Sequence, residues 1–240
     1  MNPKLHLQVL PTAEEIARTA AAQMIGLLRR RADLSIPFGL ALSGGRIAGT
    51  FYRALTAAAQ GKPDDFESVH FFWADERCVP AFDPENNYLI ARPSLFEPLK
   101  IPEENIHRIR GEIKSEYAVQ EAEAEICRVL PLNEAGQPLL DLVVLGMGED
   151  GHVASLFPSE GPEWVDEGSV YRKVMATKPP PERITLGYQA ILSAKEVWVL
   201  AVGPSKADAL RRLQTGDPSL PISRIVAGRP ATTVYCEPLA

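Results

Sequence analysis

Four short apolar segments constrain the fold of this chain more than any other feature of its sequence. They are residues 38–42 (FGLAL), 69–74 (VHFFWA), 141–145 (DLVVL) and 197–202 (VWVLAV). A continuous apolar run of this length is typical of a strand that is buried on both faces. Helical patterns separate the runs, over residues 49–59, 115–130 and 205–213. The alternation predicts an α/β fold with a mostly parallel sheet between two layers of helices.

Further elements are predicted near both ends of the chain. Residues 232–236 (TTVYC) are a candidate fifth strand. Thr12 is a predicted N-cap with Glu15 as its capping-box partner, and the helix that follows ends near Arg31. The segment 158–182 is rich in Pro, Gly and acidic residues and predicts a long irregular connection. Nothing resembles a linker, so we expect one domain over residues 1–240.

Composition excludes several classes of protein. Lys and Arg total 25 and Asp and Glu total 31, which gives a net charge of −6 and disfavours binding to nucleic acid or an anionic membrane. No apolar run approaches the roughly 18 residues of a membrane helix, and the N-terminus has no signal-peptide pattern.

The three cysteines lack CxxC spacing, which favours a reducing compartment. We expect a cytoplasmic enzyme, a monomer or small homo-oligomer, whose partner is a small molecule.

A polar or glycine-rich cluster follows each of the four strands. The clusters are residues 43–46 (SGGR), 75–77 (DER), 146–152 (GMGEDGH) and 203–206 (GPSK). In open parallel sheets, ligands bind at the edge formed by the carboxyl ends of the strands. Turns need Gly and Ser as well, but four such clusters together predict one composite site.

The first and last clusters suit a phosphate monoester. Ser43, Gly44 and Gly45 lie at a strand-to-helix junction, where backbone N–H groups bind anions. Ser43 adds a hydroxyl group. Lys206 lies at the start of another predicted helix and adds a flexible, positively charged side chain. A tight turn remains the alternative explanation for the glycines, and a solvated surface lysine for Lys206.

His152 is the candidate general base. It follows a glycine loop at a strand end, and a neutral imidazole accepts protons near neutral pH. Asp150 and Glu149 are both candidates for stabilising the imidazolium that forms, and the sequence leaves that choice open.

Several familiar motifs fail. Gly146, Gly148 and Gly151 match GxGxxG, the motif of dinucleotide-binding folds. Such folds also place an acidic residue at the end of the next strand, about 20 residues later, and that region of this sequence shows no clear strand pattern. The negative charge of Asp150 would also repel the pyrophosphate of a dinucleotide. GxxxxGK[ST], GxSxG and HExxH are absent. A hydrolase built from this chain therefore needs water activated by a side chain, without metal or covalent serine.

Ordered motifs along nearly the whole chain resemble the 6-phosphogluconolactonases, within the larger group that includes glucosamine-6-phosphate deaminase and ribose-5-phosphate isomerase. The matching segments are 40–46 (LALSGGR), 71–80 (FFWADERCVP), 83–92 (DPENNYLIAR), 105–112 (NIHRIRGE), 141–158 (DLVVLGMGEDGHVASLFP), 183–192 (RITLGYQAIL) and 203–210 (GPSKADAL). The resemblance implies a carboxylic ester hydrolase that converts 6-phospho-D-glucono-1,5-lactone to 6-phospho-D-gluconate in the oxidative pentose phosphate pathway. It also implies a three-layer, Rossmann-like α/β fold of the sugar-phosphate isomerase type, with no metal or organic cofactor.

The resemblance implies a catalytic set of His152, Asp150, Arg77 and Asp75. His152 would activate the attacking water, and Arg77 or a backbone N–H of the glycine loop would stabilise the oxyanion. Asp75 and Asp150 are included without a settled role.

The resemblance also implies a phosphate site on Ser43, Gly44 and Gly45. Arg46, Lys206 or Arg77 would neutralise the phosphate, and Arg183 is a further candidate substrate contact. The family loop commonly reads SGGxTP, whereas Arg46 is followed here by Ile-Ala. Two outcomes are open: a charged contact from Arg46 compensates for the missing hydroxyl, or the affinity for phosphate is weaker.

Two alternative functions remain: a sugar-phosphate isomerase or deaminase on the same fold, and a non-catalytic sugar-phosphate sensor. The deaminases carry a glutamate five residues after the matching histidine, where this chain has Phe157. They also tend to have tyrosine where this chain has Arg77. Both differences favour the lactonase.

Overall fold

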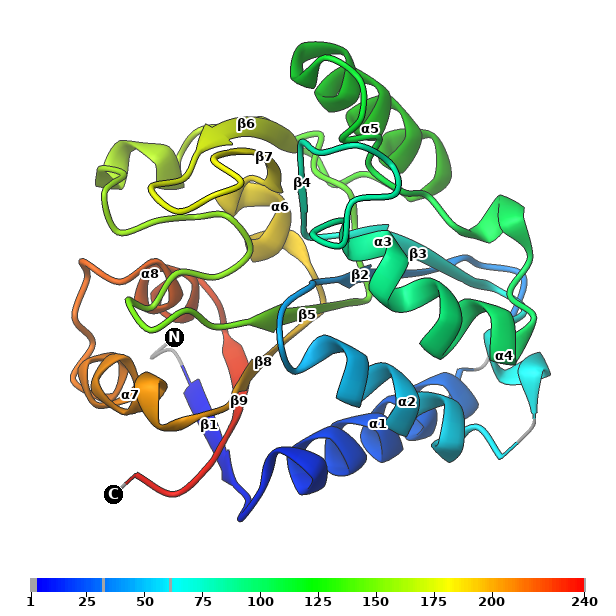
Figure 1. Cartoon of the computed structure of the whole chain (residues 1–240), viewed down its shortest axis with the longest axis horizontal. Helices are drawn as coiled ribbons and strands as arrows, with labels where there is room; N and C mark the ends of the chain where they lie inside the picture. The colour runs from blue at the N-terminus through cyan, green and yellow to red at the C-terminus, as the bar shows by residue number, and fades with distance from the viewer. Residues whose placement is uncertain (1–3, 32, 61, 240) are drawn as a thin grey trace.

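A six-stranded parallel sheet forms the centre of the molecule, in the order β1-β9-β8-β5-β2-β3 (Figure 1). The computed structural model describes residues 4–31, 33–60 and 62–239. The strands are β1 (Lys4–Val9), β2 (Phe38–Leu42), β3 (Val69–Trp73), β5 (Leu142–Gly146), β8 (Glu196–Ala201) and β9 (Ala231–Cys236). All neighbouring pairs in this sheet are parallel, so the predicted parallel sheet is confirmed.

The five predicted strands correspond to β2, β3, β5, β8 and β9, and no strand end differs from its prediction by more than one residue. Residues 38–42 are buried along their whole length, as the apolar run predicts. The sequence analysis missed β1, which lies at the sheet edge beside β9. Because an edge strand is only partly covered, β1 carries mixed polar and apolar residues rather than a continuous apolar run.

Helices cover both sides of the sheet. Figure 1 shows α1 and α2 side by side on one side, and α5, α6 and a second small sheet on the other. The helices are α1 (Ala13–Arg29), α2 (Ala48–Ala58), α3 (Asn87–Ala91), α4 (Glu97–Leu99), α5 (Ser115–Val129), α6 (Tyr188–Ser193), α7 (Ala207–Gln214) and α8 (Pro221–Ala227), with a π-helical turn, Arg92–Phe96, between α3 and α4. Thr12 caps α1 as predicted, because its Oγ1 accepts the Glu15 N–H at 3.2 Å. Among the described residues, no helix combines the length and hydropathy needed to cross a bilayer.

The prediction that residues 158–182 form a long irregular connection is wrong for residues 171–175. Strand β6 (Tyr171–Met175) lies within that segment and pairs with β7 (Glu182–Leu186). β7 also pairs with β4 (Asp75–Arg77), and the three form an antiparallel sheet in the order β4-β7-β6. β6 has a partly exposed, alternating pattern (YRKVM), so its strand character depends on a partner that only the tertiary structure supplies.

The chain leaves the main sheet at Ala74, and β4 begins at the next residue. Because side chains alternate along a strand, Asp75 and Arg77 face one side and Glu76 faces the other. Glu76 is fully buried, and its Oε1 accepts the backbone N–H groups of Arg77 at 2.8 Å and Asn87 at 2.9 Å. Burial raises the pKa of Glu76 to about 8. Glu76 therefore holds the start of α3 in place. The side chains of Asp75 and Arg77 lie on the opposite face of β4 from Glu76.

Two histidines join β3 to α5 at the far edge of the sheet. His70 Nδ1 lies 2.9 Å from His107 Nε2, and His107 Nδ1 lies 2.8 Å from a carboxylate oxygen of Glu125. Arg128 holds the same carboxylate at 2.6 Å. Burial lowers the pKa of both histidines; their mutual repulsion and Arg128 lower that of His70 further, and Glu125 partly opposes the shift at each ring.

We expect this histidine pair to make the fold sensitive to acid. The pKa of each ring is lower in the folded chain than the ordinary value near 6.5, so the unfolded chain binds protons more readily. The free energy of unfolding should therefore fall as the pH drops through about 6.5. Denaturant unfolding between pH 7.5 and 5 measures this, and His70→Gln, which keeps a hydrogen-bonding group without titrating, should flatten the dependence. An unchanged slope in that variant would contradict the assignment.

Candidate active site

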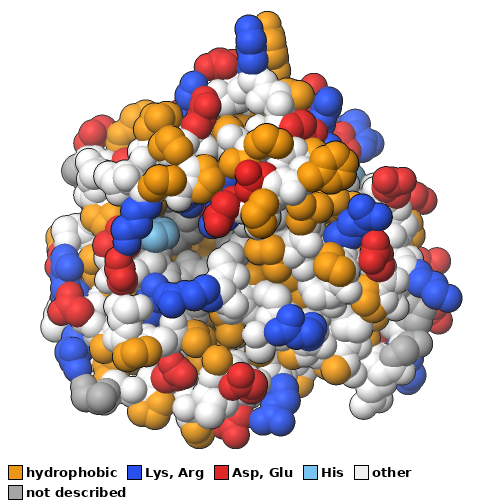
Figure 2. Space-filling model, in the orientation of Figure 1, with side chains coloured by type: hydrophobic (Ala, Val, Ile, Leu, Met, Phe, Trp, Pro, Cys, Tyr) orange, Lys and Arg blue, Asp and Glu red, His pale blue; other side chains and the backbone are white. Residues whose placement is uncertain are grey.

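A cavity of about 380 Å³ opens at the carboxyl ends of β2, β5 and β8. Figure 2 shows a hollow on this face with a histidine and several basic side chains around it. Every site residue predicted from the sequence lines this cavity except Asp150, which contacts His152, and its alternative Glu149. The predicted residues that line it are Ser43, Gly44, Gly45, Arg46, Asp75, Arg77, His152, Arg183 and Lys206.

The loop after β2 forms one wall of the cavity. The Tyr52 hydroxyl of α2 donates to the Ser43 carbonyl oxygen at 2.7 Å and fixes the turn. Ser43 Oγ is buried and has no hydrogen-bond partner within the described part of the chain. A Cβ on Gly44 would lie 1.8 Å from Asn87 Oδ1, and Gly45 has φ +90°. Both positions therefore require glycine, for close approach and for left-handed backbone.

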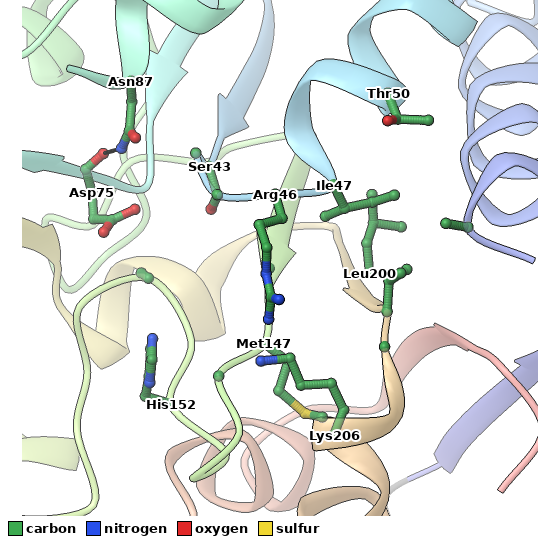
Figure 3. A pocket seen from close by; sticks show the side chains of 18 of the residues that line it. Ser43, Arg46, Ile47, Thr50, Asp75, Asn87, Met147, His152, Leu200 and Lys206 are labelled. Atoms are coloured by element: carbon green, nitrogen blue, oxygen red, sulfur yellow. Dashed lines mark hydrogen bonds between the residues drawn. The ribbon is translucent and has the colours of Figure 1, made fainter. Parts of the chain in front are cut away.

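Arg46 and Lys206 bring two positive charges together at one end of the cavity (Figure 3). Lys206 ends the 3₁₀ turn Pro204–Lys206 that leads into α7, and it is only 8% exposed. Burial lowers its pKa, and repulsion from Arg46 lowers it further. A bound anion would relieve that repulsion, so this end of the cavity suits a phosphate.

His152 and Asp150 form a hydrogen-bonded pair in the loop after β5. His152 Nδ1 lies 2.6 Å from Asp150 Oδ1. Partial burial alone would raise the pKa of Asp150, but the charge and hydrogen bonds of His152 outweigh it and hold the pKa below its usual value. The ionised carboxylate only accepts, so Nδ1 carries the hydrogen and Nε2 is left as the proton acceptor. Glu149, the alternative partner, pairs instead with Lys178 at 2.5 Å.

The loop that holds this pair depends on a glycine. A Cβ on Gly148 would lie 2.0 Å from His152 Nδ1 and 2.6 Å from Asp150 Oδ1. The ring of Phe157 packs against the His152 ring, with 5.1 Å between their centroids. Gly148 and Phe157 together restrict where the imidazole can lie.

The second sheet contributes Asp75, Arg77 and Arg183. Arg77 and Arg183 are register partners on β4 and β7. Arg77 Nη1 donates to the carbonyl oxygen and to the carboxylate of Glu85, at 2.7 and 2.8 Å. Arg183 is 9% exposed, and burial followed by repulsion from Arg77 lowers its pKa. Asp75 is also buried, and its Oδ2 accepts the Ser155 hydroxyl at 2.8 Å.

The sequence analysis missed Asn87, which lines the cavity. Its segment reads as the start of a helix, where Asn is an ordinary cap. In the structure Asn86 is the cap, since its side chain accepts the Tyr88 N–H at 3.0 Å. Two adjacent asparagines, of which a cap needs only one, were the available signal.

The geometry also bears on the motifs that fail. Residues 152–170 are all described by the structure and contain no α-helix, so the glycine loop 146–151 does not lead into the helix N-terminus that a dinucleotide pyrophosphate needs. Among the residues that the structure describes, no three His, Cys, Asp or Glu side chains are grouped to hold a metal ion.

Comparison with known proteins gives consistent relatives. The family described as "Glucosamine-6-phosphate isomerases/6-phosphogluconolactonase" matches residues 11–235. The 6-phosphogluconolactonase of Haemophilus influenzae is 33% identical over 235 residues, which cover 96% of each protein. That of Treponema pallidum is 36% identical over 199 residues, covering 82% of this chain and 80% of its own. A solved structure of the Trypanosoma brucei 6-phosphogluconolactonase, 25% identical, has a TM-score of 0.86 and covers 98% of this chain and 97% of its own.

Proposed function

Because the chain belongs to the glucosamine-6-phosphate isomerase/6-phosphogluconolactonase family, we propose that it hydrolyses 6-phospho-D-glucono-1,5-lactone to 6-phospho-D-gluconate. The observation that carries the proposal is one cavity lined by His152, which is hydrogen-bonded to Asp150, together with Arg46 and Lys206. The first pair supplies a base, and the second supplies charge for a phosphate. A phosphorylated lactone requires both.

The phosphate binds at the cationic end. Arg46 and Lys206 neutralise it, and the backbone N–H groups and hydroxyl of the Ser43–Gly45 turn donate to its oxygens. Arg46 replaces the hydroxyl that the family loop usually offers. The buried, unpartnered Ser43 Oγ supports this arrangement.

His152 acts as the general base. Its Nε2 takes a proton from water while the water oxygen bonds to the lactone carbonyl carbon. Arg77, or a backbone N–H of the 146–151 loop, stabilises the oxyanion, and Arg183 adds positive potential. When the oxyanion collapses, the bond from the carbonyl carbon to the ring oxygen breaks, and the imidazolium returns its proton to that oxygen. The ionised Asp150 stabilises the imidazolium between these steps.

The isomerase or deaminase alternative needs a second acid–base group near the histidine. At the position where deaminases carry glutamate, the apolar ring of Phe157 lies against His152. Phe157 cannot carry a proton, which favours the hydrolase.

A direct assay tests the proposal. Lactone generated in place by oxidation of glucose 6-phosphate should be hydrolysed far above its spontaneous rate. Glucosamine 6-phosphate should give no ammonia. Binding of sugar phosphates without turnover of either substrate would instead indicate a sensor and overturn the proposal.

We also expect Gly148→Ala to abolish most of the activity. The added Cβ must displace either the imidazole or the carboxylate, since it would lie 2.0 Å from one and 2.6 Å from the other. A loss of kcat of at least about 10²-fold follows if the base is misplaced. Gly168→Ala is the matched control, because a Cβ there meets nothing within 4 Å. Wild-type kcat in a folded Gly148→Ala variant would contradict the placement of His152.

A further inference from the structure

Asn87 is a buried amide with an unused acceptor at the wall of the active-site cavity. It is 1% exposed and lines the cavity. Its backbone N–H donates to Glu76 at 2.9 Å, and its Nδ2 donates to the Asp75 carbonyl oxygen at 2.9 Å. Its Oδ1 has no hydrogen-bond partner within residues 4–31, 33–60 and 62–239. A buried acceptor left unpaired lowers the stability of the fold, and because Asn87 lines the cavity, a ligand hydroxyl would supply the missing partner.

The orientation of the amide is fixed by its neighbours. Turning it over would place Oδ1 against the Asp75 carbonyl oxygen, where two acceptors repel each other. Gly44 gives Oδ1 the space it occupies, because any side chain there would clash with it. Capping of α3 does not explain Asn87, since Asn86 performs it.

The cavity carries hydrogen-bond acceptors as well as cations, because Asp75 and Asn87 line it beside Arg77 and Arg183. Arg46 and Lys206 offer only hydrogen-bond donors, whereas Asp75 and Asn87, which carry a carboxylate and an amide, line a different wall (Figure 3). The Asp75 carboxylate is held by Ser155 at 2.8 Å. A complementary ligand carries an anion at one end and hydrogen-bond donors along its body. In a phosphorylated sugar lactone those donors are hydroxyl groups.

We infer that Asn87, supported by Asp75, is a specificity-determining residue that accepts a hydrogen bond from a ring hydroxyl of the lactone. The inference rests on the proposed function for the identity of the substrate. A site built to hydrogen-bond a hydroxyl rejects the analogue that lacks it, because its buried polar group is then left unpaired. The wild-type chain should therefore discriminate strongly against one deoxy analogue.

The experiment compares kcat/KM for the parent lactone with kcat/KM for its 2-, 3- and 4-deoxy analogues. Each is made in place by oxidation of the corresponding 6-phosphorylated sugar. The wild type should prefer the parent over one analogue by about 10²-fold or more. Asn87→Ala should lose about 10²-fold on the parent and less than about 3-fold on that analogue, so that the preference nearly disappears.

Asn105→Ala is the matched control. Asn105 is also buried, and its Nδ2 donates to the Glu67 carbonyl oxygen at 3.0 Å, but it does not line the cavity. It should retain the full preference.

Two results would overturn the inference. One is an equal loss on all substrates in Asn87→Ala, which indicates a structural role only. The other is a wild-type chain that hydrolyses all three analogues as well as the parent, which is decisive even if the variant fails to fold. If the wild type hydrolyses no lactone, the proposed function fails separately. The same preference is then measured as thermal stabilisation by 6-phosphogluconate and its deoxy analogues, and equal stabilisation by all of them would overturn the inference.

Discussion

Replacing His152 by alanine is expected to lower the enzyme-dependent rate of lactone hydrolysis by about 10²–10⁴-fold, the usual contribution of a general base. Nδ1 of the imidazole is held by Asp150 at 2.6 Å, so Nε2 is the ring nitrogen that is placed to accept a proton. We expect kcat to fall with little change in KM, because the residues proposed to bind the phosphate, Arg46 and Lys206, lie elsewhere in the cavity. Stopped-flow or pH-indicator kinetics measure it after subtraction of spontaneous ring opening.

The matched control for this variant is His6→Ala, because His6 is exposed on the edge strand β1. It should retain wild-type kinetics. Circular dichroism should show that His152→Ala keeps its fold, since the His152 side chain is 31% exposed and packs mainly within its own loop. Near-wild-type turnover in a folded His152→Ala variant would end the general-base assignment.

Replacing Lys206 by alanine should raise KM for the phosphorylated lactone by about 10–100-fold, the range expected for loss of a charge-assisted hydrogen bond. KM for unphosphorylated gluconolactone should change little, because that substrate offers no anion to the cationic end. The ratio of the two effects is the informative quantity. It separates phosphate binding from a general distortion of the site.

Lys178→Ala is the control for Lys206. Lys178 is 76% exposed and pairs with Glu149 near the cavity, so its removal changes local charge without removing a cavity cation. KM for the phosphorylated lactone should stay within about 3-fold of the wild-type value. If Lys206→Ala weakens both substrates equally, Lys206 does not belong to the phosphate site.

Much of the main sheet was predictable because its strands are buried on both faces. Such strands must be apolar over several consecutive residues, and residues 38–42 and 141–145 carry that signal without any knowledge of their neighbours. The same holds for the capped start of α1 at Thr12. The second sheet gave no comparable signal, because β4 has three residues and β6 is partly exposed.

The candidate site also has parts that the sequence predicted and parts that only the structure revealed. His152 and Asp150 are two residues apart in one loop, so their pairing was among the options that the sequence offered. The choice of Asp150 over Glu149 required the structure, which directs Glu149 to Lys178. The meeting of Arg77 with Arg183 also depends on the pairing of β4 with β7, and the place of Asn87 beside Gly44 depends on the packing of distant segments.

The sequence alone determined the apolar strands, the loops at their carboxyl ends and the residue types for acid–base and anion chemistry, since each is encoded by residues close together in the chain. The tertiary structure decided which of these loops share one cavity, that Glu76 turns away from it and that Asn87 faces it. These outcomes depend on pairings between distant segments, where packing and alternation along a strand choose the direction of each side chain. Short-range patterns carry no record of that choice.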